Sequence, residues 1–242
     1  MTRKRADVAL VERGFFESRA RAQEAIAAGL VLVNGAPVRK ASETVPDGAE
    51  ILAEPPHPYV SRGGVKLAAA LDAFGLDPSG LTCIDVGSST GGFTDVLLRR
   101  GVAHVYAVDV GHGQLHAKLQ GNPRVTSLEG TDARILTREL IPAPLDMLVS
   151  DVSFISLKLA LPAAVALLKP KASLAVLVKP QFEAGRGHVR KGIVRDEAVH
   201  RAVCENLESF IVSMGFSVIG LAPSPIEGGD GNREFLLGAR RG

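Results

Sequence analysis

The stretch Ile84-Asp85-Val86-Gly87-Ser88-Ser89-Thr90-Gly91-Gly92-Phe93 decides the fold of most of this chain. A hydrophobic run ends in an acid, a tight turn of glycine and serine follows, and a helix is predicted from Phe93 to Arg100. This succession is typical of the first strand, turn and helix of an open α/β sheet that binds a nucleotide. The glycines let backbone approach a ligand closely, and the helix N-terminus offers free N–H groups.

The same stretch restricts the kind of ligand. Its glycine spacing is not G-x-G-x-x-G, which argues against a dinucleotide pyrophosphate. An acid at the strand end beside glycines better suits a ligand that contains an amino-acid moiety and a ribose, and S-adenosylmethionine (SAM) is such a ligand. For the motif alone, a tight turn that binds no ligand is the alternative.

Apolar, strand-like runs alternate with helix-like segments after residue 60, which predicts a parallel α/β sheet with helices on both faces. The last two runs are joined by a Pro/Gly-rich loop too short for a crossover helix, so the last strand is expected to be antiparallel. A seven-stranded, Rossmann-like sheet with this ending is similar to the SAM-dependent methyltransferase architecture. The strand-like runs are 81–86, 104–110, 125–128, 145–150, 173–178, 217–221 and 234–239.

Acids follow several of these runs, at the sheet edge where ligands bind. Asp109 lies 24 residues after Asp85, near the spacing expected of an acid that binds ribose hydroxyls. Asp132-Ala133 follows the third run and is a candidate to contact an adenine amino group. The candidate cofactor residues are Asp85, Gly87, Ser88, Ser89, Thr90, Gly91, Gly92, Phe93, Asp109, Val110, Asp132, Ala133 and Asp151.

Residues 1–54 are expected to form a small, basic α+β module. A first helix ends at Gly14, Ser18 is placed to cap a second helix, and Asn34-Gly35 is a strong hairpin signal. The whole chain has a formal net charge of only +2, so any electrostatic argument for nucleic acid is local. Up to Lys40, eight Lys and Arg stand against four acids, a local excess of +4 that suits phosphates, although a solvated basic face explains it equally well.

The order of residues in this module resembles the S4 RNA-binding domain. The resemblance covers most of residues 3–52 and rests on Ser18-Arg19-Ala20, Ala22, Ile26, Gly29, Val31 and Val33-Asn34-Gly35. It implies that arginines of the second helix face structured RNA. The candidate RNA-binding residues of the module are Arg3, Lys4, Arg5, Arg19 and Arg21.

Pro55-Pro56-His57-Pro58 is predicted to be a stiff spacer, because three prolines in four residues favour extended backbone. The expected domains are therefore 1–54, a linker over 55–60, and 61–242. The larger domain is expected to begin with a helix from about Arg62 to Phe74, capped by Ser61.

Composition excludes several classes of protein. Two cysteines, Cys83 and Cys204, without a C-x-x-C pair argue against a disulfide scaffold or a zinc site. The longest apolar run, 159–168, has ten residues, whereas a membrane span needs about 20. The chain starts without the apolar core of a signal peptide. We therefore expect a cytoplasmic protein that binds neither a metal nor a membrane.

Four charged residues stand out by their context. Lys179 follows the apolar run 174–178, and Asp151 occupies the same position after the neighbouring run. Glu234 begins the last run, and Lys66 lies in the helix before the first one. Taken singly, each has an alternative explanation as an exposed charge or a structural ion pair.

Taken in order along the chain, these features resemble the TlyA family of ribosomal RNA 2′-O-methyltransferases, often called haemolysins. The resemblance spans nearly the whole chain and includes Val60-Ser61-Arg62-Gly63, Ser89-Thr90-Gly91-Gly92-Phe93-Thr94, Asp109-Val110-Gly111, Gly113-Gln114-Leu115, Ser153-Phe154-Ile155-Ser156-Leu157, Val178-Lys179-Pro180-Gln181-Phe182-Glu183 and Gly231-Asn232-x-Glu234. One departure is the linker His57-Pro58-Tyr59-Val60, which lacks the Arg and Trp of some members. That puts a linker-based coupling of RNA binding to cofactor affinity in doubt.

The resemblance implies an FtsJ-like, SAM-dependent methyltransferase domain over 61–242 that methylates a ribose 2′-hydroxyl of cytidine in ribosomal RNA. Ribosomal RNA or ribosomal subunits are the implied partners. The family's K-D-K-E catalytic tetrad falls on Lys66, Asp151, Lys179 and Glu234. Lys179 is the candidate base if it can lose its proton; otherwise it orients the hydroxyl or stabilises charge on the oxygen.

Two further features are open to more than one interpretation. The loop 183–195 follows the catalytic run and is either a mobile basic lid over the RNA or a surface loop. His112 and His116 are spaced like metal ligands, but without an obvious third ligand we interpret them as structural or substrate-lining. Outside the first module, the candidate RNA-binding residues are Arg62, Arg186, Arg190 and Lys191.

Two other functions compete with the methyltransferase hypothesis. A cytolytic protein is poorly supported, because no membrane-active amphipathic helix is evident. An RNA-binding assembly factor without activity would not need the four charged residues in their family positions.

Overall fold

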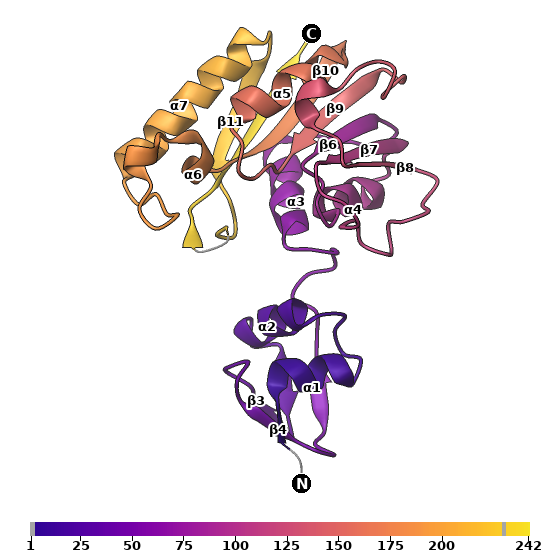
Figure 1. The fold of residues 1–242 in the computed structure, drawn as a ribbon, viewed down its shortest axis with the longest axis vertical. Helices are drawn as coiled ribbons and strands as arrows, with labels where there is room; N and C mark the ends of the chain where they lie inside the picture. Colours follow the sequence, from indigo (N-terminus) through magenta and orange to yellow (C-terminus); the bar gives the residue numbers. More distant parts are fainter. Residues whose placement is uncertain (1–2, 229–230) are drawn as a thin grey trace. The chain divides into compact units, whose positions relative to one another are not determined.

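A computed structural model describes residues 3–228 and 231–242 (Figure 1). The chain folds as two compact units, Met1–Pro58 and Tyr59–Gly242. The predicted boundaries at residues 54 and 60 stay predictions.

The first unit packs two helices against short strands. Ser18 caps α2 by accepting a hydrogen bond from the Arg21 backbone N–H, as predicted. Asn34 and Gly35, at φ 49° and 76°, form the expected hairpin turn. Leu10, Ile26 and other apolar side chains fill a core of its own. Its elements are β1 (Arg3–Arg5), α1 (Ala6–Glu12), α2 (Arg19–Ala27), β2 (Val31–Val33), β3 (Ala36–Pro37), β4 (Thr44–Pro46) and β5 (Ile51–Ala53).

The second unit is built on a seven-stranded sheet of order β11-β12-β10-β9-β6-β7-β8. Strand β12 runs antiparallel to both of its neighbours, and the pairings among β10, β9, β6, β7 and β8 are parallel. The predicted fold class and the antiparallel last strand are confirmed. The strands are β6 (Thr82–Val86), β7 (His104–Asp109), β8 (Val125–Glu129), β9 (Leu145–Ser150), β10 (Leu168–Val178), β11 (Ser217–Pro223) and β12 (Phe235–Arg241).

Helices cover both faces of this sheet (Figure 1). Apolar side chains of α3 and α4 share one core with the sheet, and those of α5 and α7 share the other. The helices are α3 (Gly63–Phe74), α4 (Gly92–Arg99), α5 (Leu157–Ala166), α6 (Pro180–Glu183) and α7 (Glu197–Ser213), with 3-10 turns at Ala133–Ile135 and Arg186–His188. Among the described residues, no helix is long and apolar enough to cross a bilayer.

The predicted cap of α3 is wrong. Arg62, not Ser61, occupies the N-cap position, and no described side chain caps the helix. The reason is local: Gly64 N donates to Ser61 O and Val65 N donates to Arg62 O, both three residues back, so the chain enters α3 through a tighter turn and the regular helix begins at Gly63. The Ser61 hydroxyl instead faces Gly92, where an added Cβ would lie within 2.2 Å of it.

Candidate active site

The loop between β6 and α4 adopts a path that requires glycine. Gly87 and Gly91 have φ values of 83° and 89°, which side-chain-bearing residues rarely adopt. A Cβ on Gly91 would lie 2.2 Å from Leu119 Cδ1, and one on Gly87 would lie 2.9 Å from Val152 Cγ1. The loop is thus pinned between two segments, and its backbone is left open toward the carboxyl edge of the sheet.

Asp85 lies behind this loop rather than in it. Its side chain is fully buried, and Thr94 Oγ1 donates a 2.7 Å hydrogen bond to its Oδ2. Oδ1 has no hydrogen-bond partner in the described part of the chain. Burial raises the pKa of Asp85 to about 7, although the Thr94 hydrogen bond opposes this. Asp85 therefore supports the loop from beneath, and it is not one of the described residues that line the cavities below.

A cavity of about 440 Å³ opens at the carboxyl ends of β6, β7 and β9, within the size range of small-molecule sites. Several predicted cofactor residues line it: Gly87, Ser89, Asp109, Val110, Asp132, Ala133 and Asp151. Sequence reasoning assigned no cofactor contact to Gly111, Gln114, Thr131 or Ile155, which also line it. Gln114 and Ile155 belong to segments that carry the family resemblance, which is the signal that could have identified them.

A smaller cavity, about 160 Å³, adjoins the same loop. Asp151 belongs to the walls of both cavities, and Lys179 belongs to the wall of the smaller one. The predicted loop residues Ser88, Thr90, Gly92 and Phe93 line this smaller cavity.

Asp109 holds two loops at the mouth of the large cavity. Its Oδ2 accepts a 2.8 Å hydrogen bond from Ser89 N, and its Oδ1 accepts a 2.8 Å bond from Gly111 N. A carboxylate has about four acceptor positions. Asp109 can therefore accept further hydrogen bonds from two hydroxyl groups while it keeps both loops in place.

Asp132 is already partnered within its own turn. It accepts hydrogen bonds from Arg134 N at 2.9 Å and from the Arg134 guanidinium at 2.5 to 3.0 Å. These bonds lower the pKa of Asp132 to about 2. The carboxylate shapes the cavity wall, and its contact to an adenine amino group stays a prediction.

The four charged residues form two ion pairs. Lys179 Nζ lies 2.6 Å from Asp151 Oδ1 and donates a 2.8 Å hydrogen bond to Ser153 Oγ. Lys66 Nζ lies 2.5 Å from Glu234 Oε2, and both of these side chains are buried. Sequence reasoning gave no role to Ser153, the partner that fixes the direction of the Lys179 ammonium.

A third cavity, about 340 Å³, joins the two ion pairs, because Lys179 and Glu234 both line it. The rings of Phe154 and Phe182 line it as well, with centroids 5.1 Å apart. Phe154 is 91% exposed and has a φ of 65°, so an apolar ring is presented to solvent by an uncommon backbone conformation. Phe154 also lines the large cavity.

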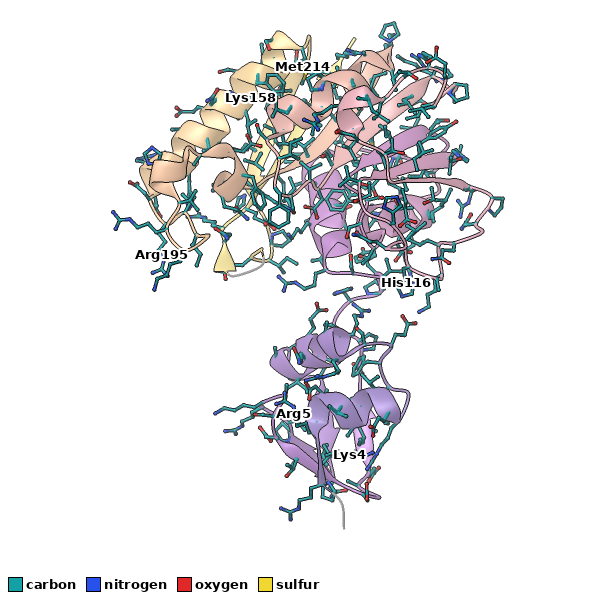
Figure 2. All side chains as sticks on the ribbon, viewed as in Figure 1. Lys4, Arg5, His116, Lys158, Arg195 and Met214 are labelled. Atoms are coloured by element: carbon teal, nitrogen blue, oxygen red, sulfur yellow. The ribbon has the colours of Figure 1, made fainter. Side chains whose placement is uncertain are left out.

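The predicted RNA-binding residues of the first unit differ in their exposure and in their hydrogen-bond partners. Arg5 and Arg19 are exposed, and both donate to the buried carboxylate of Asp7. Arg21 is half-buried instead and turns to His57, whose ring nitrogens lie 2.8 and 3.1 Å from Arg21 Nη1. Figure 2 labels Lys4 and Arg5, neighbours on the exposed strand that also includes Arg3. Lys4 pairs with Glu12 at 2.5 Å.

The basic residues of the second unit lie on its loops. Arg190 and Lys191 are exposed on a turn closed by a bridge between Arg190 and Ile193. Arg62 donates to the Glu227 carbonyl at 2.5 Å. Arg195, labelled in Figure 2, is exposed just before α7. Arg186 starts a 3-10 turn, and its side chain lies outside the described atoms.

Within residues 3–228 and 231–242, no three His, Cys, Asp or Glu side chains gather in a way that could hold a metal ion. His112 lies against Gly130, where an added Cβ would be 2.4 Å from His112 Nε2.

The sheet order, the glycine loop and the large cavity at the carboxyl edge define a SAM-dependent methyltransferase. Residues 59–241 match the FtsJ-like methyltransferases, and residues 4–51 match the S4 domain. The chain belongs to the FtsJ-like methyltransferase family, and within it to the group typified by TlyA.

Two curated relatives span nearly the whole chain. A Mycobacterium tuberculosis protein named 16S/23S rRNA (cytidine-2′-O)-methyltransferase TlyA is 43% identical, over 98% of this chain and 90% of its own length. A Brachyspira hyodysenteriae protein named Hemolysin A is 41% identical, over 96% of this chain and 98% of its own length.

Among solved structures, a Streptococcus thermophilus protein named as a hemolysin has a TM-score of 0.78 and 44% identity, covering 100% of this chain and 89% of its own. Magnesium protoporphyrin IX methyltransferase from Synechocystis, solved with bound SAH, has a TM-score of 0.51 and 16% identity, covering 75% and 82%. At that identity the likeness shows the fold alone.

Proposed function

We propose that this protein transfers the methyl group of SAM to the 2′-hydroxyl of a cytidine ribose in ribosomal RNA. The observation that carries the proposal is the position of Lys179. It lines the cavity beside the glycine loop together with Asp151, and it lines the third cavity together with Glu234. A side chain at this position can contact a nucleoside in the third cavity and the methyl donor in the cavity beside the glycine loop. The name of the Mycobacterium tuberculosis relative supports the choice of acceptor.

The residues of the large cavity fit SAM. Gly87 and Ser89 of the glycine loop line this cavity, and Asp109 has acceptor positions left for two ribose hydroxyls. Ala133 and Ile155 offer apolar surface suited to a purine ring. When bound, SAM supplies an electrophilic methyl group on a positively charged sulfur.

Lys179 would orient the acceptor hydroxyl. Its Nζ lies 2.6 Å from Asp151 Oδ1, and a lysine side chain in this position has further N–H donors that can reach the acceptor oxygen. We therefore assign Lys179 the role of holding the 2′-oxygen in line with the methyl group, which is mainly a positioning effect. In that transfer the methyl–sulfur bond would break as the O–C bond forms, the electron pair would stay on the neutral thioether that leaves, and the hydroxyl proton would be released to water.

The other ion pair would fix the acceptor side. Glu234 lines the third cavity and is held by Lys66, a residue buried in α3. Glu234 is thereby kept at one angle toward a bound nucleoside.

RNA would be held by basic residues on both units. Arg5 and Arg19 lie on the S4 unit, and Arg190 and Lys191 lie on the turn after α6. Each phosphate contact adds affinity that falls with salt. We propose assembled ribosomal subunits as the natural substrate.

The test is methyl transfer from radiolabelled SAM to ribosomal subunits that lack the modification, followed by nucleoside analysis. We expect label in 2′-O-methylcytidine and its loss in Lys179→Ala. Lys171→Ala is a matched control, because Lys171 is an exposed lysine near the start of the same strand, β10. Absence of transfer to subunits or free RNA, with SAM binding intact by calorimetry, would overturn the proposed acceptor.

A further inference from the structure

We propose that Gln181 selects the base of the target nucleotide by accepting a hydrogen bond from the exocyclic amine of cytosine. This inference rests on the proposed function and assigns a discriminating residue to the third cavity. Gln181 lines that cavity beside Lys179, two positions earlier in the chain. The residue that reads the base would thus lie two positions after the residue that orients the ribose.

The side-chain amide of Gln181 has an oxygen that lacks a hydrogen-bond donor among the described residues. This oxygen, Oε1, is buried. Buried polar atoms in folded proteins are nearly always hydrogen-bonded, so an exception next to a cavity marks a position that a ligand can complete. The missing partner of a carbonyl oxygen is an N–H or O–H donor.

The backbone on both sides of Gln181 is fixed. Pro180 begins the short helix α6, and Glu183 ends it. Glu183 accepts hydrogen bonds from Ser156 Oγ at 2.6 Å and from Leu157 N at 2.7 Å. The turn that carries Gln181 is therefore anchored to the start of α5, which limits where the amide can reach.

The wall of the same cavity suits a planar base. Phe154 and Phe182 present two rings, one of them almost fully exposed. Aromatic side chains that stack an unpaired base tolerate any base, because every base has a π-face. Stacking alone would therefore not choose cytosine, and the choice requires a polar group that meets the edge of the ring.

Cytosine and uracil differ at that edge. Cytosine carries an amine donor at C4, and uracil carries a carbonyl acceptor at the same position. An acceptor held there completes its hydrogen bond with cytosine. In the amide orientation of this structure, with Oε1 toward the base, it would face the O4 acceptor of uracil and leave both oxygens unpaired. A good hydrogen-bonded pair of this kind is expected to discriminate about 10- to 100-fold between bases.

The experiment compares kcat/KM for ribosomal subunits that carry cytidine or uridine at the mapped target nucleotide. We expect the wild-type protein to favour cytidine by about 10- to 100-fold. Gln181→Glu keeps only acceptors at this position and should retain the preference. Gln181→Leu should bring the ratio of the two substrates to within about threefold of one, because it removes the acceptor. Phe154→Leu, a change in the same wall, should slow both substrates and leave the ratio unchanged.

The outcomes separate the two proposals. Methylation of cytidine and uridine at equal rates by the wild-type protein, or an unchanged ratio in Gln181→Leu, would overturn the role of Gln181 alone. Absence of transfer to either substrate, with SAM binding intact, would overturn the proposed function and this inference with it.

Discussion

Arg19 donates two hydrogen bonds to the buried carboxylate of Asp7, from Nε at 3.1 Å and from Nη2 at 2.8 Å. Arg5 donates two more, and Gln23 Nε2 adds one at 2.7 Å. The guanidinium groups of two exposed arginines are thus held by a single acid that solvent does not reach. These contacts hold the pKa of Asp7 well below its usual range, with the Arg5 hydrogen bond as the largest cause.

We predict that Asp7→Asn weakens RNA binding although it makes the S4 unit more positive. If attraction to phosphate alone mattered, loss of an acid would tighten binding. Because Asp7 orients Arg5 and Arg19, we expect affinity to fall about tenfold instead, as charge-assisted bonds depend on geometry. Fluorescence anisotropy with ribosomal RNA fragments at several salt concentrations measures the change. Glu12→Gln is the control, because Glu12 pairs with Lys4 on the exposed surface. Tighter binding by Asp7→Asn would refute the prediction.

A second prediction concerns the glycine loop. Gly91→Ala should weaken SAM binding at least about tenfold. The new Cβ would displace Leu119. In addition, residue 91 has a left-handed backbone conformation, which is strained for alanine. Isothermal titration calorimetry measures the affinity, and thermal melting reports any loss of fold. Gly185→Ala should change neither quantity, since a Cβ at Gly185 meets nothing within 4 Å. Equal SAM affinity in both variants would show that the loop tolerates the side chain.

A third prediction concerns pH. Because burial raises the pKa of Asp85 to about 7, the folded state binds a proton that the unfolded state has released above pH ~4. Stability should therefore fall as pH rises from 5 to 7, and then level off. Asp85→Asn lacks this contribution. The unfolding free energy of the variant minus that of the wild type should therefore be roughly 2–3 kcal/mol larger at pH 8 than at pH 5. Urea unfolding at the two pH values, monitored on the second unit, measures the difference. A constant difference would mean that Asp85 is ionised throughout.

The sequence was sufficient for the sheet and for part of the site. Parallel strands bring their carboxyl ends to one edge of the sheet, so the sequence predicts that Asp109, Asp151 and Lys179 lie at the same edge. Asp85 was predicted to contact the cofactor, but side chains alternate along a strand. Its carboxylate therefore faces Thr94 of α4.

Contacts between residues far apart in the sequence could not be predicted from the sequence. Lys66 and Glu234 are separated by 168 residues, and only the packing of α3 beside β12 makes them partners. Arg21 was expected to face RNA, because nothing local shows that His57 of the linker reaches it. No sequence pattern predicts that Gln181 Oε1 lacks a described partner, because this depends on which residues surround the amide in the fold. The roles assigned to all these residues stay predictions.

Variants of the Lys66–Glu234 ion pair can distinguish a role of Glu234 in stability from a role in methyl transfer. Lys66→Met leaves a buried carboxylate without its partner, which should cost about 3–5 kcal/mol of unfolding free energy. Adding Glu234→Gln removes that charge, so the double variant should recover more than half of the loss, as replaced buried pairs often do. Methyl transfer should nevertheless stay low in the double variant, because Glu234 lines the cavity assigned to the nucleoside. Denaturant unfolding and kcat/KM for ribosomal subunits are measured on the wild type, both single variants and the double variant. If activity returns together with stability, the pair is structural only, and Glu234 does not act on the substrate.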